Sequence, residues 1–417
     1  MTSAPIYTLK VNQYAYGGEG IGRLPDGRAV FVPFVLAGEE VRLRLAEQKR
    51  GYARAELLEV LTPAPERIPP RCVHFGVCGG CHYQHLPYEN QLAVKAGILR
   101  DQLERIGKLT DPPVHPTVPS PEAFNYRNHV QFDLTHEGSL GYHQERSQKV
   151  LAIRECHLPE PVLNQIWPQL DFEAEPGFQR VGLRQGADGD VLLVLESEDI
   201  SPPAITVEDL PVSVVHLSPA GSLVLAGSET LIMEVLGRTF QVSAGSFFQV
   251  NTHQAEQLVE HILETIPTYQ ILDSSSTLVD AYCGVGLFSA FLAARVGRLI
   301  GVESNSNACE DFVVNLDEFD NVELYEAPLE AVLPGMDIYP QVILVDPPRA
   351  GIDRAALDGL LGLNPPLIVY VSCDPATLGR DARRLAAGGY ELAQVTPFDM
   401  FPQTYHIESI SFWTKIN

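Results

Sequence analysis

Residues 277–303 of the chain, TLVDAYCGVGLFSAFLAARVGRLIGVE, decide its fold class. An apolar stretch is followed by a turn with two glycines, a segment of helical periodicity and a second apolar stretch that ends at Glu303. Two further apolar stretches follow, QVILVDPP at 341–348 and LIVYVSCDP at 367–375. Strands that alternate with helices predict a parallel, doubly wound α/β sheet. We therefore expect a Rossmann-like domain over residues 240–417.

The chain before residue 240 has a different pattern. In residues 1–61, short apolar runs alternate with turns such as YGGEGIG at 16–22, which predicts a small β-barrel. Pro63 to Pro70 contains four prolines and is typical of a linker. Residues 62–239 should form a central β-rich domain. Within it, residues 88–108 have helical periodicity, and we expect this helix to pack on the C-terminal domain.

Charge is distributed unevenly along the chain. The formal net charge is −24, which argues against nucleic acid as a partner. Residues 1–150, however, carry 17 basic and 16 acidic residues, whereas residues 151–417 carry 12 and 37. The segment 41–54 has five basic residues and one acid, which fits a local basic platform and a solvated strand pair equally well. No run of about 18 apolar residues and no secretory signal is present, so we expect a cytoplasmic protein without a membrane span.

Seven cysteines occur in the chain, and an odd number argues against a disulfide framework. Cys72, Cys78 and Cys81 lie within ten residues of one another. This clustering predicts a thiolate-bound metal, and the spacing alone leaves zinc and iron–sulfur open.

The glycine-containing turn Asp280–Gly286 predicts a ligand site, because ligands bind beyond the carboxyl ends of the strands in a doubly wound sheet. Glu303 ends the next strand, where a carboxylate can accept hydrogen bonds from both hydroxyls of a ribose. The turn lacks the GxGxxG pattern, so a nucleoside such as S-adenosylmethionine is favoured over a dinucleotide.

A nucleophile and a base are suggested by two other segments. Cys373 follows an apolar strand and is flanked by Ser372 and Asp374, which suit a loop better than a core. His406 and Glu408 are two residues apart on a predicted extended segment and point the same way. A thiolate that adds to C6 of uracil makes C5 nucleophilic, and a base must then remove the C5 proton. We choose Glu408 as this base, with His406 as the alternative.

Five segments resemble the signature motifs of the RNA uracil-5 methyltransferase family: SFFQVN (246–251), DAYCGVGLFS (280–289), VDPPRAG (345–351), VYVSCDPATLGRD (369–381) and FDMFPQTYHIE (398–408). The resemblance implies Cys373 as nucleophile and Glu408 as general base. It also implies that S-adenosylmethionine is bound by Gln249, Tyr282, Glu303 and Asp346. Phe247 or Phe248 would lie near the target base, and Arg127 and Arg349 are candidate RNA contacts.

The N-terminal part resembles the larger members of this family. Residues 1–61 are similar to the TRAM domain, an RNA-binding β-barrel. The pattern Cys72-x5-Cys78-x2-Cys81 with the distant Cys156 resembles the branch that carries a [4Fe–4S] cluster, which implies these four cysteines as its ligands. There are three departures: Asp374 stands where many relatives have Asn, and Leu287 and Pro328 replace Asn found in some relatives.

The resemblance implies methylation of C5 of a specific uridine in 23S ribosomal RNA as the leading function. The same chemistry on the T-loop uridine of tRNA is the alternative. A catalytically silent RNA-binding iron–sulfur protein is the alternative from another class. We expect a monomer without an obligate protein partner.

Overall fold

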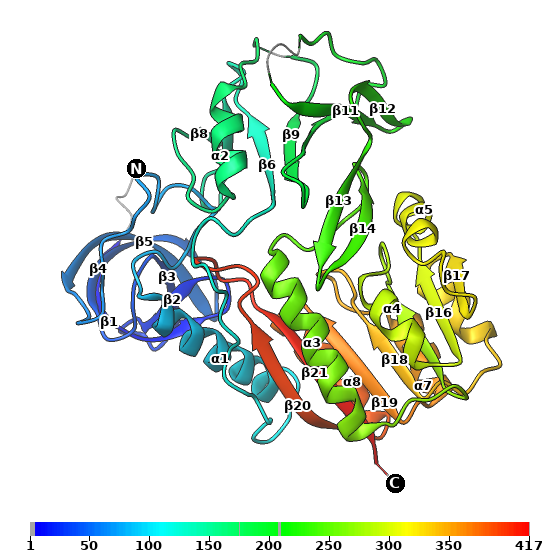
Figure 1. Cartoon of the computed structure of the whole chain (residues 1–417). Helices are drawn as coiled ribbons and strands as arrows, with labels where there is room; N and C mark the ends of the chain where they lie inside the picture. Colours follow the sequence, from blue (N-terminus) through cyan, green and yellow to red (C-terminus); the bar gives the residue numbers. More distant parts are fainter. Residues whose placement is uncertain (1–4, 175, 207–209, 417) are drawn as a thin grey trace.

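The computed structural model describes residues 5–174, 176–206 and 210–416. Its strands form a closed barrel, a seven-stranded central sheet, a hairpin and a seven-stranded C-terminal sheet (Figure 1). The barrel is built from residues before 63, and the C-terminal sheet from residues after 276. The expected combination of a small barrel, a β-rich middle and a mixed α/β domain is therefore confirmed. The boundaries at residues 61 and 239 stay a prediction.

The barrel has the strand order β1-β2-β3-β5-β4. Its strands are β1 (Ile6–Ala15), β2 (Glu19–Arg23), β3 (Ala29–Pro33), β4 (Glu40–Gln48) and β5 (Tyr52–Thr62). Alternate apolar residues fill the interior, as the period of two requires. The outward arginines of β4 form ion pairs with acids of β5. Arg42 Nη2 lies 2.7 Å from Glu59 Oε2, and Arg44 Nη2 lies 2.7 Å from Glu56 Oε2. The basic stretch on this face is thus a solvated strand pair.

Helix α1 (Tyr88–Arg105) lies between the barrel and the C-terminal sheet (Figure 1). Its Leu99 and Leu103 share a buried cluster with Leu378 and Ala382 of α8 (Pro375–Ala387). Lys95 on the same helix is fully buried and bonds to Asp399, near the end of the chain. The helix expected over 88–108 therefore packs on the C-terminal sheet and ends three residues earlier.

The central sheet has the order β12-β11-β10-β9-β6-β7-β8. Its strands are β6 (His129–Leu134), β7 (Leu140–His143), β8 (Val150–Ala152), β9 (Arg180–Gln185), β10 (Val191–Glu196), β11 (Val212–Ser218) and β12 (Gly221–Ala226). The short helix α2 (Pro161–Ile166) covers its core at Leu163 and Ile166. The hairpin of β13 (Thr230–Val235) and β14 (Arg238–Ser243) leads into the C-terminal part.

The C-terminal sheet has the order β17-β16-β15-β18-β19-β21-β20. Its strands are β15 (Thr277–Ala281), β16 (Arg298–Glu303), β17 (Val322–Glu326), β18 (Val342–Val345), β19 (Leu367–Ser372), β20 (Tyr390–Phe398) and β21 (Glu408–Lys415). Its remaining helices are α3 (Thr252–Tyr269), α4 (Leu287–Leu292), α5 (Ser306–Asn315), α6 (Leu329–Val332) and α7 (Arg354–Leu363). The first five strands in this order are parallel to their neighbours, and β21 runs antiparallel to both β19 and β20. The parallel sheet was expected, whereas the reversed strand was not.

Among the helices that the structure describes, none is both long and apolar enough to cross a bilayer.

Candidate active site

The predicted site residues lie side by side at the carboxyl edge of the C-terminal sheet. Glu303 ends β16, Tyr282 follows β15, Asp346 follows β18 and Cys373 follows β19. These four strands are consecutive neighbours, and β21 comes next. Ser372 pairs with Ser409 in the antiparallel ladder, so Cys373 stands opposite Glu408. Only a reversed strand can bring its first residue to this edge, which explains how β21 delivers Glu408.

The turn after β15 holds the backbone close to Glu303. Gly284 and Gly286 have φ of +53° and +91°, values that glycine adopts without strain. Gly284 N–H donates to Glu303 Oε2 over 3.0 Å. The backbone N–H groups of Ser304 and Asn305 donate to Oε1 over 2.7 and 2.8 Å. The Glu303 carboxylate is thus held in place by three of its roughly four lone-pair sites, and the remaining site on Oε2 is free for a ligand.

Carboxyl groups are crowded along this edge. Burial, together with the charge of Glu303, raises the pKa of Asp280 to about 7, although a 2.6 Å hydrogen bond from Ser289 Oγ opposes the shift. Burial and the charges of Asp280 and Glu303 raise the pKa of Asp346 to about 7 as well. Asp280 Oδ1 is buried without a hydrogen-bond partner. A cationic ligand would relieve the repulsion among these carboxyl groups.

The predicted nucleophile and base lie in the same environment. Burial raises the pKa of the Cys373 thiol to about 12, and the charges of Glu408, Asp346 and Asp374 add to the shift, while Arg349 opposes it. Glu408 is 3% exposed, and burial with the charge of Asp346 raises its pKa well above the ordinary value. The charge of Glu408 therefore disfavours loss of the proton from the Cys373 thiol.

Arg349 and His406 flank this pair differently. Arg349 is exposed and lowers the pKa of both Cys373 and Glu408. Burial and the nearby Arg349 and Arg127 lower the pKa of His406 to about 3. Its ring packs against Tyr405 with centroids 4.3 Å apart. An imidazole held neutral in this way is a weaker base than the carboxylate beside it.

The SFFQVN segment lies between β14 and α3 and is held by hydrogen bonds to α5. Asp311 of α5 accepts hydrogen bonds from Ser243 N–H, from Ser243 Oγ and from Ser246 Oγ. Phe247 is 67% exposed, whereas Phe248 is 3% exposed and packs in the core. Phe248 is therefore unavailable to an RNA base, and Phe247 is the candidate of the pair. Gln249 is buried, and its backbone carbonyl accepts a hydrogen bond from Asn128 Nδ2 over 3.0 Å.

The four predicted cluster cysteines come together although Cys156 is distant in sequence. Burial is the main cause of the raised pKa of Cys78 and Cys81, and Cys156 adds to both shifts. Cys72 adds to the shifts of Cys78 and Cys156. Backbone N–H groups of His74 and Gly80 donate to the sulfurs of Cys72 and Cys78, each over 3.4 Å. All four thiols are free.

These thiols are not arranged for one metal ion. In residues 5–174, 176–206 and 210–416, no three His, Cys, Asp or Glu side chains form a group tight enough to hold a single ion. A tetrahedral zinc site requires sulfurs about 3.8 Å apart, given a Zn–S bond of about 2.3 Å. An iron–sulfur cluster spreads its cysteine ligands over several iron atoms. The described residues therefore contain no metal-binding group, and the four cysteines as cluster ligands stay a prediction.

The cysteine segment docks on the loop that precedes Glu408. The backbone N–H groups of His82 and Tyr83 donate to Gln403 O over 2.8 and 3.0 Å. Gln91 Nε2 donates to Gln403 Oε1 over 3.0 Å. The guanidinium of Arg127 lies 5.7 Å from the centre of the Phe401 ring and lowers the pKa of Cys81 in opposition to burial. Arg127 thus bridges the cysteine group and this loop, and it is half-buried rather than displayed.

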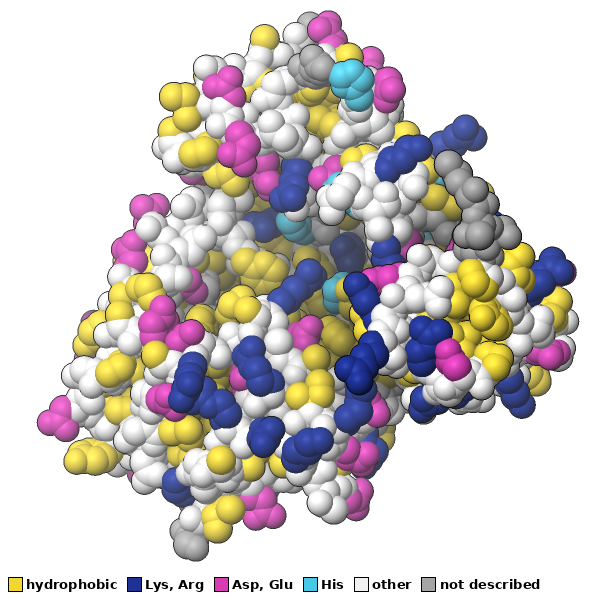
Figure 2. Space-filling view, turned by 180° about the vertical axis from the view of Figure 1, so that it is seen from behind, with side chains coloured by type: hydrophobic (Ala, Val, Ile, Leu, Met, Phe, Trp, Pro, Cys, Tyr) yellow, Lys and Arg dark blue, Asp and Glu magenta, His cyan; other side chains and the backbone are white. Residues whose placement is uncertain are grey.

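A groove of about 700 Å³ opens where the barrel, the cysteine segment and the central sheet meet. It is lined by Tyr16 and Arg54 of the barrel, His82, Arg146 and Tyr405. Figure 2 shows basic side chains gathered around a hollow in the middle of this face of the molecule. Arg54 and Arg146 both pair with Glu19 of β2, at 2.9 and 2.5 Å. The groove leads from the barrel to Tyr405, three residues before Glu408.

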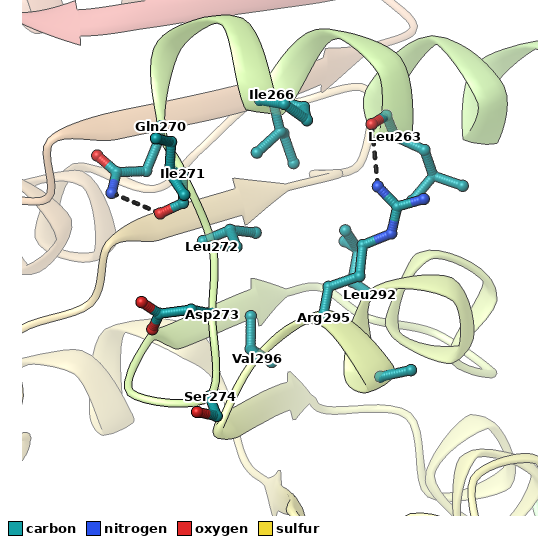
Figure 3. Close-up of a pocket in the computed structure, with 12 residues that line it drawn as sticks. Leu263, Ile266, Gln270, Ile271, Leu272, Asp273, Ser274, Leu292, Arg295 and Val296 are labelled. Atoms are coloured by element: carbon teal, nitrogen blue, oxygen red, sulfur yellow. Dashed lines mark hydrogen bonds between the residues drawn. The ribbon is translucent and has the colours of Figure 1, made fainter.

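A second cavity, of about 520 Å³, lies at the opposite edge of the sheet (Figure 3). The end of α3, the following residues 270–274 and the segment after α4 form its walls. Arg295 closes one side by donating to the carbonyl of Leu263 over 3.1 Å. The lining residues 270–274 lead into the start of β15, whereas the site residues follow the ends of the strands. This cavity is therefore remote from the row of site residues.

The three departures from the family pattern have separate positions. Leu287 is buried in the core at the start of α4, and Pro328 is exposed before α6. Neither side chain can donate a hydrogen bond. Asp374 caps α8 and accepts from Ala376 N–H and Thr377 N–H, each over 2.9 Å.

Two family models match this chain. Residues 209–416 match the family model described as tRNA (uracil-5-)-methyltransferase, and residues 6–58 match the TRAM domain. An uncharacterized RNA methyltransferase of Thermosynechococcus vestitus is 38% identical over 97% of both chains. Another from Aquifex aeolicus is 34% identical over 97% of both chains.

Among solved structures, the chain is similar to the Pyrococcus abyssi tRNA (uracil-54, C5)-methyltransferase in complex with S-adenosyl-L-homocysteine. The TM-score is 0.73 at 25% identity, and the match covers 98% of this chain and 100% of the other.

Proposed function

Because the chain belongs to the tRNA (uracil-5-)-methyltransferase family, we propose that it methylates C5 of a uridine in 23S ribosomal RNA through a covalent bond from Cys373 to C6. The observation that carries this mechanism is the ladder pairing that sets Cys373 opposite Glu408 at the carboxyl edge of the sheet.

S-adenosylmethionine supplies the methyl group when it is bound. Glu303, Tyr282 and Asp346 are the proposed contacts, together with Gln249 from the SFFQVN segment. Glu303 and Cys373 are three strand spacings of about 4.8 Å apart, which is room for a nucleoside between them. The orphaned oxygen of Asp280 and the crowded carboxyl groups fit a ligand that carries positive charge.

Cys373 forms and breaks one bond in each cycle. Its thiolate adds to C6 of the uracil, and the π-electron pair of the C5–C6 bond becomes available at C5. C5 uses this pair to bond the methyl carbon, and the methyl–sulfur bond of the sulfonium would break with its electron pair left on sulfur. Glu408 as carboxylate then removes the C5 proton, the double bond re-forms and the thiolate leaves. The raised pKa of Glu408 suits this step, since a stronger base takes a carbon-bound proton more readily.

Phe247 is the proposed stacking partner of a base taken out of its helix. Its exposure and its position two residues before Gln249 support this assignment. Arg349 is the proposed basic contact with the RNA. Its side chain is exposed, and its charge lowers the pKa of both Cys373 and Glu408.

We also propose that Cys72, Cys78, Cys81 and Cys156 ligate a [4Fe–4S] cluster. The grouping of four free thiols with two N–H···S contacts supports it. Because the cysteine segment bonds to Gln403, such a cluster would order the loop that leads to Glu408.

The T-loop uridine of tRNA is the second candidate substrate. The similar archaeal protein is a tRNA (uracil-54, C5)-methyltransferase, and its likeness extends over nearly the whole chain. The barrel therefore does not by itself discriminate between the two RNAs.

One experiment tests both the chemistry and the substrate. Transcripts of 23S rRNA and of tRNA that contain 5-fluorouridine are incubated with the enzyme and S-adenosylmethionine, and adducts are resolved on denaturing gels. Fluorine cannot leave C5 as a proton does, so the covalent complex should persist with the true substrate. Cys373→Ala should give no adduct and no methylation. Adducts formed by Cys373→Ala would refute the mechanism, and an adduct with tRNA alone would replace the rRNA proposal.

A further inference from the structure

The turn between β1 and β2 carries a barrel residue into the C-terminal domain. Tyr16 Oη donates a hydrogen bond to Asp374 Oδ2 over 2.8 Å, and the two residues are 358 positions apart. The Tyr16 ring also meets the edge of Tyr405, with centroids 5.6 Å apart. Gly18 of the same turn lies so close to His82 that a Cβ would approach its ring within 2.9 Å. This turn is therefore packed against the catalytic side of the molecule.

Asp374 is fully engaged at the position next to the proposed nucleophile. Oδ1 accepts the N–H groups of Ala376 and Thr377, and Oδ2 accepts Tyr16. The Asp374 carbonyl accepts the hydroxyls of Ser372 and Thr377, each over 3.1 Å. The backbone on both sides of Cys373 is fixed through this one residue.

We propose that the N-terminal barrel completes the active site through Tyr16, which is a positioning residue for the loop that carries Cys373. This inference rests on the proposed function, because it assumes that Cys373 is the nucleophile. The barrel then has a second task beside RNA binding: it holds Asp374 in the geometry that presents the thiol.

Tyr16 also offsets the negative charge of Asp374, which lies beside the Cys373 thiol. The groups that face Cys373 are Glu408 of β21, Asp346 and Arg349 after β18, Asp374 at the start of α8, and Tyr16. Three of them are acids, so every donor that offsets a carboxylate favours the thiolate. Burial and the charge of Asp374 hold the pKa of Tyr16 far above its usual range, so its hydroxyl remains a donor.

The test measures the single-turnover rate of adduct formation between pH 6 and 10, with whichever 5-fluorouridine transcript traps the wild-type enzyme. Tyr16→Phe deletes one hydroxyl and keeps the ring against Tyr405. Losing a hydrogen bond to a charged group costs about a factor of ten, so the rate near pH 7.5 should fall about 10-fold. Because the thiol pKa of about 12 lies above this range, both rates should rise with pH, and at saturating RNA the variant should stay about 10-fold slower at every pH.

Two further variants isolate the contact. Asp374→Asn keeps an oxygen to cap α8 and removes the charge, so Tyr16→Phe in this background should change the rate less than about 2-fold. Tyr7→Phe deletes a hydroxyl from β1 of the same barrel, away from the site, and should leave the rate unchanged.

A Tyr16→Phe enzyme that matches the wild type at every pH would overturn the inference. So would a variant that is slowed only at limiting RNA and reaches the wild-type rate at saturating RNA, because that result would make Tyr16 an RNA contact. An adduct formed by Cys373→Ala would instead overturn the proposed function, so the two failures are distinguishable.

Discussion

Replacing Lys95 by Met should destabilise the protein through the carboxylate that it leaves behind. Lys95 Nζ lies 2.5 Å from Asp399 Oδ1, and both side chains are fully buried. Nζ also donates to Phe401 O over 3.0 Å, whereas the buried Asp399 Oδ2 has no hydrogen-bond partner among the described residues. Removing one member of a buried pair costs about 3–5 kcal/mol. For a domain of this size, that loss corresponds to roughly 10 °C in Tm.

The assay combines thermal unfolding with hydrogen exchange of residues 399–407. Exchange is needed because a chain with several parts need not unfold in one step. Lys95→Met should speed exchange in this loop, and Lys95→Met with Asp399→Leu should restore most of the lost stability, since no charge is then stranded. The reasoning fails if the single variant is as stable as the wild type, or if the double variant is as unstable as the single one.

Four further outcomes are expected. Glu408→Gln should let a protein–RNA adduct accumulate on normal uridine RNA, and fast turnover without adduct would exclude Glu408 as the base. Phe247→Ala should weaken RNA binding by about 1–3 kcal/mol in a filter assay, the worth of one stacked base, with little change in Tm; Phe248→Ala should instead lower stability by about 3–5 kcal/mol. Because folding raises the pKa of Asp280 to about 7, its contribution to stability should fall as pH rises from about 4 to 7, and calorimetry should find a flatter dependence in Asp280→Asn. Protein purified without oxygen should be brown and contain iron, and Cys81→Ala should lose both; a colourless, zinc-loaded wild type would contradict the cluster proposal.

The strands around Asp280, Asp346 and Cys373 were predictable because parallel, buried strands are continuous apolar runs with polar residues where they end. Their neighbour β21 was harder, because nothing local shows that a strand runs in reverse. The exposure of Phe247 and the burial of Phe248 follow from the way Asp311 anchors the segment, which no pattern in SFFQVN reveals.

Several side-chain contacts between separately folded parts were not predicted. Tyr16 looks like an ordinary turn residue, and its partner Asp374 is 358 positions away. Lys95 looks like a solvent-facing position of an amphipathic helix, yet it is fully buried. Such pairs depend on how separately folded parts dock, and a single sequence carries no local signal for docking.

The reversed strand β21 has a consequence for biosynthesis. Glu408 opens the last strand that the structure describes, whereas Tyr16 belongs to the first turn of the barrel. A growing polypeptide can therefore fold its barrel and most of its sheet on the ribosome while it still lacks the proposed base. On the proposed mechanism, a chain that bonded to a uridine before β21 had folded could not release it, so productive turnover requires β21.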